Sequence, residues 1–212
     1  HQAAEIGLDP RQFLTFIIRQ SLKVRVLSHP RGRKFQAIKQ QLDSLMSLSL
    51  DRDNSKRRIA VIMGGYSFER HISMESGRNI YEKLSSSEEF EPIPLFLAGD
   101  SNEYKLYSLP LAYMLKDNAD DIRDKILHHD TDLLLEEIRY EASLLRNKYN
   151  PEGGHFTPEE IPLYRLKEEV EGAFIALHGR PGEDGTLQRD LADIDIYYNG
   201  SPSESSEVTI YK

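Results

Sequence analysis

The stretch from Gly172 to Gln188, GAFIALHGRPGEDGTLQ, constrains the fold more than any other part of the chain. A short apolar run bounded by glycines is typical of a strand that is buried on both faces. The run stops in a turn that places one His, one Arg, one Glu and one Asp among three glycines. Polar side chains at the carboxyl end of a parallel strand are where open α/β sheets bind small molecules. The simpler alternative is a surface loop in which Asp184 caps a helix that begins near Thr186.

A second strand, turn and helix opens the main part of the chain. Residues 58–63 (RIAVIM) predict an apolar strand, a pair of glycines follows it, and residues 73–84 predict a helix. Neither the G-x-G-x-x-G dinucleotide fingerprint nor a P-loop is present. Glu69 and Ser73 are four residues apart at the helix start, so both side chains can project into one cleft. These patterns predict an α/β fold with a Rossmann-like open, mostly parallel sheet flanked by helices. The expected apolar stripe of this helix is Ile72, Ser76, Ile80 and Leu84.

The rest of the chain divides into a helical extension and a main domain. We predict residues 1–55 as a helical extension and linker, and residues 56–212 as the main domain with an insertion at about 98–171. Prolines early in the strand at 90–97 place that part near a sheet edge. The other expected elements are helices at 10–27, 34–48, 120–149 and 186–192, a short helix starting at 157–160, an edge strand at 104–107 and a strand at 194–198.

Charge and composition exclude several classes of protein. The net charge is −8, yet residues 1–55 carry nine Lys and Arg against five Asp and Glu, leaving 18 against 30 in the remainder. An acidic main domain argues against nucleic acid as its partner. The basic stretch at 31–34 is either a solvated linker or an RNA-contact patch. No apolar run reaches the length of a membrane span, and the absence of cysteine excludes thiolate metal sites and fits a reducing compartment. We therefore expect a cytoplasmic protein.

Three segments resemble the signatures of D-alanine–D-alanine ligases. Residues 59–77 (IAVIMGGYSFERHISMESG) resemble the family pattern G-G-x-S-x-E-x-x-[IV]-S-x-x-S-[AG]. Residues 174–188 (FIALHGRPGEDGTLQ) resemble H-G-x-x-G-E-D-G-x-[LIV]-Q, and residues 198–201 (YNGS) fall where the family has Y-T-G-S. The resemblance covers about residues 57–97 and 172–212. It implies an N-terminal pre-ATP-grasp substrate domain.

The resemblance also implies the roles of three catalytic residues. Members of this family use ATP to phosphorylate the carboxylate of one D-alanine, and the amine of a second D-alanine then attacks the acyl phosphate. Glu69 matches the carboxylate that faces the ammonium of the first D-alanine, and Ser73 matches a neighbouring group that helps to hold Glu69. His178 matches the histidine beside the reacting carboxyl. Taken alone, Glu69 could instead begin a helix, and His178 could be an ordinary turn residue.

Further residues are implied as ligand contacts. Gly179 and Glu183 join Glu69 and His178 as substrate-binding positions, and Lys212 falls on the family lysine that reaches the ATP phosphates. A solvated terminal charge is the alternative for Lys212. The chain departs from the family where small residues are usual, at Glu204 and Glu207, and it has Tyr211 in place of an acidic or amide residue.

The chain ends where the family's ATP-grasp domain would begin. We expect that domain of the same polypeptide to bind ATP and Mg²⁺, so that this piece alone is inactive and binds no cofactor of its own.

Residues 2–22 resemble the last helix of the same family, which would make the parent a tandem ligase; an unrelated amphipathic helix is the alternative. We expect D-alanine as the substrate, and a homodimer is one possible assembly. Two alternatives stay open: a degenerate, non-catalytic regulatory module, and a ligase for another D-amino or D-hydroxy acid such as D-serine or D-lactate.

Overall fold

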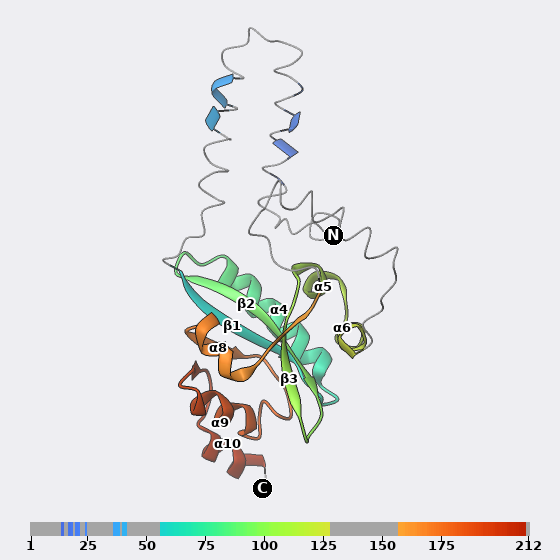
Figure 1. Cartoon of the computed structure of the whole chain (residues 1–212), viewed down its shortest axis with the longest axis vertical. Coiled ribbons are helices and arrows are strands. Elements are labelled where there is room, and N and C mark those ends of the chain that lie inside the picture. The colour runs from blue at the N-terminus through green and yellow to red at the C-terminus, as the bar shows by residue number, and fades with distance from the viewer. Residues whose placement is uncertain are drawn as a thin grey trace. The chain divides into compact units, whose positions relative to one another are not determined.

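The computed structural model describes residues 56–127 and 157–210, together with isolated helical positions between residues 14 and 41 (Figure 1). The chain divides into two units, one of residues 1–53 and 132–156 and the other of residues 54–131 and 157–212. The predicted helices at 10–27 and 34–48 are helical at their described positions, and the end of the 120–149 helix and Lys212 lie outside the described residues. The elements of the second unit are β1 (Arg57–Gly64), α4 (Arg70–Ser85), β2 (Phe90–Gly99), β3 (Tyr104–Ser108), α5 (Leu111–Lys116), α6 (Ala119–Leu127), β4 (Glu159–Ile161), α8 (Leu163–Glu169), β5 (Gly172–Ile175), α9 (Thr186–Asp193), β6 (Tyr197–Tyr198) and α10 (Ser203–Ile210).

The strands form one open, mixed sheet in the order β4-β3-β2-β1-β5-β6. Strands β2, β1, β5 and β6 run parallel, whereas β3 and β4 are antiparallel to their neighbours. The predicted open, mostly parallel α/β sheet is therefore confirmed.

Two local predictions at the antiparallel end of the sheet are wrong. The strand at 104–107 exists as β3, but it is not the edge, because Leu106 pairs with Ile161 of β4 beyond it. The helix start expected at 157–160 is instead strand β4. The Thr-Pro-Glu-Glu sequence resembles a helix N-terminus locally, and pairing with β3 overrides that preference.

The prolines of β2 lie where the strand has a neighbour on one side only. Pro92 and Pro94 pair in register with Ile59 and Val61 of β1, whereas pairing with β3 begins at Leu95. A proline has no N–H to donate to a second neighbour, so it is tolerated at such an edge. The carbonyl of Pro94 still accepts from the N–H of Leu109 at 2.9 Å. The prediction of an edge at the start of this strand is confirmed.

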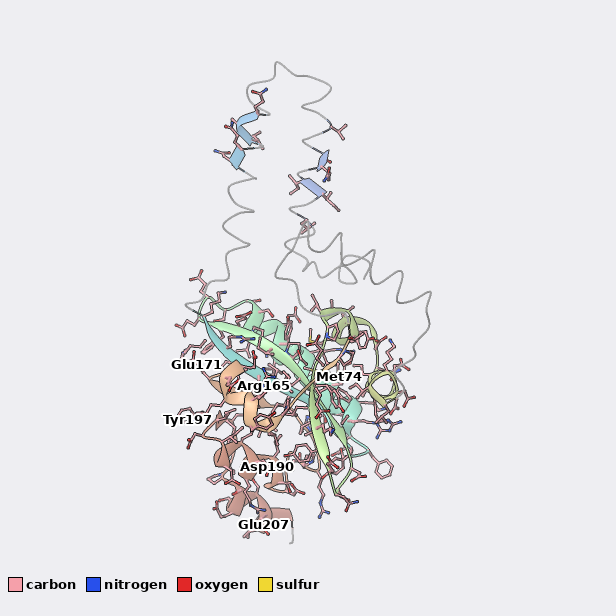
Figure 2. All side chains as sticks on the ribbon, in the orientation of Figure 1. Met74, Arg165, Glu171, Asp190, Tyr197 and Glu207 are labelled. Carbon is pink, nitrogen blue, oxygen red and sulfur yellow. The ribbon has the colours of Figure 1, made fainter. Side chains whose placement is uncertain are left out.

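Alternating side chains of the central strands build a core on each face of the sheet. Ala60 and Ile62 of β1 face one side, where Leu166 of α8 and Leu191 of α9 cover them. The other face has an equivalent core, contributed by α4, α5 and α6 over β1 and β2 and consisting of Val61, Met63, Met74, Phe96, Ala98, Leu109, Met114, Ala119 and Ile122. Met74 is labelled in Figure 2. Helices on both faces explain why the parallel strands are continuously apolar.

Helix α4 packs closer to the sheet than its predicted stripe suggests. It begins at Arg70, and its buried residues are Ser73, Met74 and Gly77, whereas Ile72 is 52% exposed. A Cβ on Gly77 would lie 2.6 Å from the Cβ of Met63, so glycine permits this close approach. The predicted place of Ile72 on the apolar face is therefore wrong, because the contact with β1 is centred one position further along the helix.

The end of the main unit differs from the predicted pattern in one element. Helix α9 matches the helix expected at 186–192, but the strand expected at 194–198 is reduced to the two residues of β6. Asp195 adopts a left-handed φ of 54°, and the N–H of Ile196 donates to the carbonyl of Leu191 at 2.9 Å. The chain must turn here to leave the helix, and only then can it pair with β5.

Candidate functional site

The two glycine-rich turns meet at the carboxyl edge of the sheet because β1 and β5 are parallel neighbours. Ala60 pairs with Ala173 and Ile62 with Ile175, and the N–H of Ala176 donates to the carbonyl of Ile62 at 2.9 Å. The chain leaves β1 toward β2 on one side, while β5 lies on the other side. Such a reversal of strand order opens a crevice for ligands in α/β sheets. The turn at 64–69 and the turn at 176–185 form the candidate site.

Three serines of the first segment hold His178 in the second turn. The Ser67 hydroxyl donates to the His178 carbonyl at 2.8 Å, and the His178 N–H donates to Ser73 Oγ at 2.9 Å. The Ser76 hydroxyl lies 2.9 Å from His178 Nε2. The backbone and the ring of this histidine are therefore both anchored to α4 and the turn that precedes it.

Glu69 presents its carboxylate at the junction of the two turns. It occupies the N-cap position of α4 but makes no side-chain capping hydrogen bond, and its side chain is exposed. Its backbone is firmly held, because its N–H donates to Ser67 Oγ at 3.1 Å and its carbonyl accepts from Ser73 Oγ at 3.2 Å. Ser73 thus contacts the Glu69 carbonyl. Within residues 56–127 and 157–210 the Glu69 carboxylate has no hydrogen-bond or ion-pair partner, which leaves it available to a cationic ligand.

Gly179 brings the second turn against the first. Its φ is +73°, and a Cβ there would lie 2.9 Å from the Cβ of Ser67 and 3.3 Å from Glu69 Oε2. A side chain would have to displace both neighbours. The structure therefore brings together four of the predicted site residues: Glu69, Ser73, His178 and Gly179.

Arg70 braces the first turn against α6. Its guanidinium donates to the Ser67 carbonyl at 3.0 Å and to Asp120 Oδ1 at 2.7 Å, and His71 Nε2 lies 3.1 Å from Asp120 Oδ2. The hydrogen bond from Arg70 holds the pKa of the Asp120 carboxyl below its usual 3.8. This contact links the candidate site to the helix layer on one face of the sheet.

Asp120→Asn is expected to remove an acid-dependent part of the stability. A carboxyl whose pKa is lowered by folding stabilises the native state above its unfolded pKa, and this contribution is lost as the pH falls through the lower folded value. The free energy of unfolding of the wild type should therefore fall below about pH 4 by more than that of Asp120→Asn. Urea unfolding at pH 7 and pH 3 measures this difference. Asp124→Asn, an exposed change on the same helix, is the control, and equal pH slopes for wild type and Asp120→Asn would contradict the assignment.

Tyr104 fastens the helix that follows the second turn. Its hydroxyl donates to Asp190 Oδ2 of α9, which is labelled in Figure 2. Burial, and then the hydrogen bond to Asp190, raise the pKa of Tyr104. The alternative that Asp184 caps this helix is also realised, since its Oδ1 accepts from the Thr186 N–H at 3.0 Å while Gly185 occupies the N-cap. This capping contact accounts for Asp184 and does not account for the other polar side chains of the turn.

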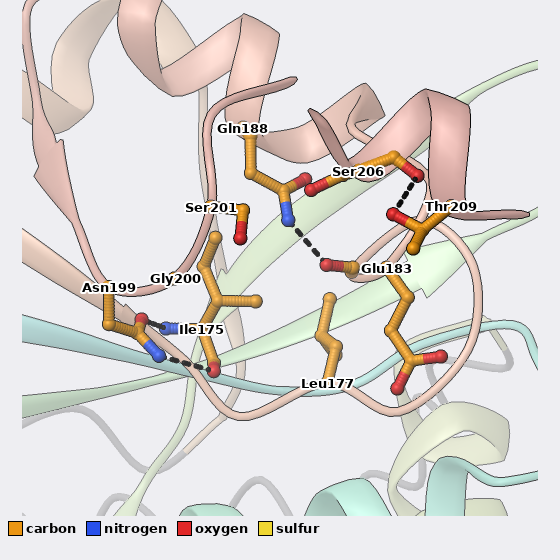
Figure 3. A pocket seen from close by; sticks show the side chains of 10 residues that line it. Ile175, Leu177, Glu183, Gln188, Asn199, Gly200, Ser201, Ser206 and Thr209 are labelled. Atoms are coloured by element: carbon orange, nitrogen blue, oxygen red, sulfur yellow. Dashed lines mark hydrogen bonds between the residues drawn. The ribbon is translucent and has the colours of Figure 1, made fainter. Parts of the chain in front are cut away.

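Glu183 lies in the wall of a cavity beside the turn, although its carboxylate points away from Gln188, Ser206 and Thr209 (Figure 3). This cavity of about 430 Å³ lies between the turn, α9 and α10 (Figure 3). Gln188 is buried in its wall and donates from Nε2 to the Gly182 carbonyl at 2.5 Å, while its Oε1 has no partner among the described residues. The lining residues are Ile175, Leu177, Gly182, Glu183, Gln188, Asn199, Gly200, Ser201, Ser206 and Thr209. The N–H of Glu183 donates to the Gly179 carbonyl at 3.0 Å, so its backbone is joined to the turn that carries His178.

Two of the departures from the family pattern lie on α10, and the third, Tyr211, lies outside the described residues. Glu204 and Glu207 are exposed, and Glu207 lies 3.2 Å from Arg189 of α9. An exposed ion pair of this kind contributes little to stability. The sequence patterns do not identify two polar residues of the site: Ser67 has no predicted role, and Ser76 is predicted to lie in an apolar stripe. Their spacing from Ser73 within one helical turn and its preceding loop is the signal that could have identified them.

Comparison with known proteins decides the family. A family model described as D-ala D-ala ligase N-terminus matches residues 58–201. The chain belongs to this family. It is 30% identical over 156 residues to a D-alanine--D-alanine ligase of Pediococcus pentosaceus, covering 73% of the chain and 40% of the relative. It is also 48% identical over 54 residues to a D-alanine--D-alanine ligase of Aquifex aeolicus, covering 26% of the chain and 19% of that relative.

Among solved structures, the VanG D-Ala:D-Ser ligase of Enterococcus faecalis has a TM-score of 0.44 at 22% identity, covering 72% of this chain and 38% of that one. This chain spans less than half the length of these curated relatives. Among the described residues no three His, Asp or Glu side chains gather as a metal-binding cluster. The described helices include none with the length and apolar character needed to cross a membrane.

Proposed function

We propose that this chain supplies the binding site for the first D-alanine in a D-alanine–D-alanine ligase. The observation that carries the proposal is the unpartnered carboxylate of Glu69 set against the anchored histidine at the meeting point of the two turns. The names of the relatives support the substrate class. An amino acid has an ammonium and a carboxylate two bonds apart, and the site offers one group suited to each.

Each end of the substrate has a partner in this arrangement. The ammonium donates to the Glu69 carboxylate, and such a charge-assisted hydrogen bond both binds and orients it. The substrate carboxylate lies toward His178, whose ring N–H can donate to an oxygen that gains negative charge during the reaction. Ser67 and Ser73 hold the backbone of His178 and of Glu69, so the two groups keep their separation. Fixed geometry of this kind lowers the entropic cost of reaching the transition state.

The remaining chemistry is assigned to an ATP-grasp domain of the same polypeptide. There, ATP and Mg²⁺ would activate the carboxylate of the first D-alanine as an acyl phosphate, and the amine of a second D-alanine would displace the phosphate to form the peptide bond. The described residues do not offer a cluster for the metal, so no step of this proposal passes through a metal bound by them. The cytoplasm, where ATP is made available, is the proposed location.

Glu69→Gln is expected to weaken binding of D-alanine to this chain about tenfold or more, because it replaces a charge-assisted hydrogen bond by a neutral one. Titration of the chain with D-alanine, followed by NMR chemical shifts, measures the change. Glu75→Gln is the matched control, since Glu75 is an exposed glutamate of the same helix that pairs with Arg78 at 2.6 Å. Equal affinity in Glu69→Gln and wild type would refute the assignment. When the chain is joined to an ATP-grasp domain, Glu69→Gln should also abolish D-alanine-dependent phosphate release.

A further inference from the structure

The ring of His178 has one described hydrogen-bond partner, Ser76 of α4, at 2.9 Å from Nε2. The two residues are 102 positions apart in the chain, so only the packing of α4 against the second turn brings them together. Neutral imidazole has one donor and one acceptor nitrogen, and its hydrogen-bond partner decides which is which.

Either group could supply the proton in this contact, and the contacts available to the Ser76 hydroxyl indicate which one does. Serine in a helix commonly donates to the carbonyl four residues earlier, as Ser73 does to Glu69 at 3.2 Å and Ser86 does to Glu82 at 3.1 Å. Ser76 makes no such bond, and within the described residues Nε2 is the one acceptor for its proton. A proton on Nε2 would leave that hydroxyl with no acceptor in this part of the chain. These contacts favour donation from the Ser76 O–H to Nε2.

We propose that Ser76 is a positioning residue that holds neutral His178 as the Nδ1–H tautomer. The proton is thereby placed on the ring nitrogen that faces away from α4. Ser67 and Ser73 fix the backbone of the same histidine, so its main chain is held in place without a ligand. Histidine in water prefers the other neutral tautomer, with the proton on Nε2, so this assignment departs from the default.

The tautomer assignment itself does not depend on the proposed function. It rests on that function only in the role given to the ring N–H, which is to donate to D-alanine. A neutral imidazole with its proton on Nδ1 can donate to the carboxylate of D-alanine without carrying a positive charge. In this arrangement Glu69 and His178 act on opposite ends of the zwitterion. Ser76 would select which ring nitrogen of the neutral imidazole offers its N–H to the carboxylate.

Long-range ¹H–¹⁵N correlation spectra of the labelled chain at pH 8 test the tautomer directly. In the wild type, His178 should show a pyridine-type Nε2 and a pyrrole-type Nδ1, with assignment by the loss of these signals in His178→Gln. Ser76→Ala should revert the ring to mainly Nε2–H, Ser76→Thr should retain Nδ1–H because its hydroxyl is kept, and Ser86→Ala should change nothing. An Nε2–H ring in the wild type would overturn the proposal, as would an unchanged tautomer in Ser76→Ala. The wild-type spectrum decides the question by itself if a variant does not fold.

Addition of D-alanine separates this inference from the proposed function. If Ser76 acts through His178, the affinity for D-alanine should fall about fivefold in Ser76→Ala and recover in Ser76→Thr. An Nδ1–H ring in a chain that does not bind D-alanine would refute the proposed function and leave the tautomer assignment intact. Binding of D-alanine to a chain with an Nε2–H ring would refute the tautomer assignment and leave the proposed function intact.

Discussion

Gly64→Ala is expected to lower the free energy of unfolding by about 2–5 kcal/mol, from two separable causes. Gly64 has a φ of +85°, and a left-handed conformation costs a residue with a side chain about 1–2 kcal/mol. A Cβ at this position would also lie 2.5 Å from Cε2 of Phe96. Phe96 is fully buried in the core under α4, so its ring can move only by disturbing that packing, at about 1–3 kcal/mol. A loss of this size is a large fraction of the stability of a small domain.

Gly200→Ala is the matched control for this change. Gly200 has a similar φ of +96°, but no atom lies within 4 Å of the position of its Cβ. Urea unfolding followed by circular dichroism should therefore show a loss of about 1–2 kcal/mol in Gly200→Ala and a larger loss in Gly64→Ala. Equal losses in the two variants would mean that the Phe96 ring accommodates the methyl group freely, and that the first turn is not held by this contact.

Gly179→Ala is expected to weaken D-alanine binding about 100-fold while leaving the domain folded. The new Cβ would lie 2.9 Å from the Cβ of Ser67 and 3.3 Å from Glu69 Oε2, so the two turns must separate to admit it. Ser67 also donates to the His178 carbonyl, and displacing it loosens the histidine at the same time. A displacement of about 1 Å between groups that act on one ligand is enough for an effect of this size. The atoms nearest to the new Cβ belong to Ser67 and Glu69 and not to either core.

Titration with D-alanine tests this prediction, and circular dichroism confirms that the variant is folded. Gly200→Ala again serves as the control, since it carries a comparable backbone cost away from Glu69 and His178 and should bind D-alanine as the wild type does. Wild-type affinity in Gly179→Ala would show that the close approach of the two turns is irrelevant to binding. The proposed site would then have to be placed elsewhere.

The strands and helices with strong apolar patterns were predictable from sequence, and the weakly patterned ones were not. Strands β1 and β5 are apolar runs ended by glycines, so their type and the positions of their turns follow from local sequence alone. Strand β4 has three residues, two of them glutamate, and it exists because β3 offers it a free edge. Its sequence carries no periodic signal, and the pairing that stabilises it is nonlocal. Strand β6 also depends on a nonlocal pairing, with β5, and it begins only after the chain has left α9.

The residues of the candidate site divide in the same way. Local sequence is enough to place Glu69, His178 and Gly179 in two turns that follow buried strands, and Ser73 at the start of the helix after the first turn. A strand, a glycine turn and a helix are each encoded by neighbouring residues. Tertiary packing alone brings Ser76 to the ring of His178 and places Glu183 in the wall of the cavity beside α9 and α10. The rotation of α4 about its axis is set by the close fit of Gly77 on Met63. That rotation turns Ser76 toward the second turn, and it depends on a contact between two elements that no local pattern records.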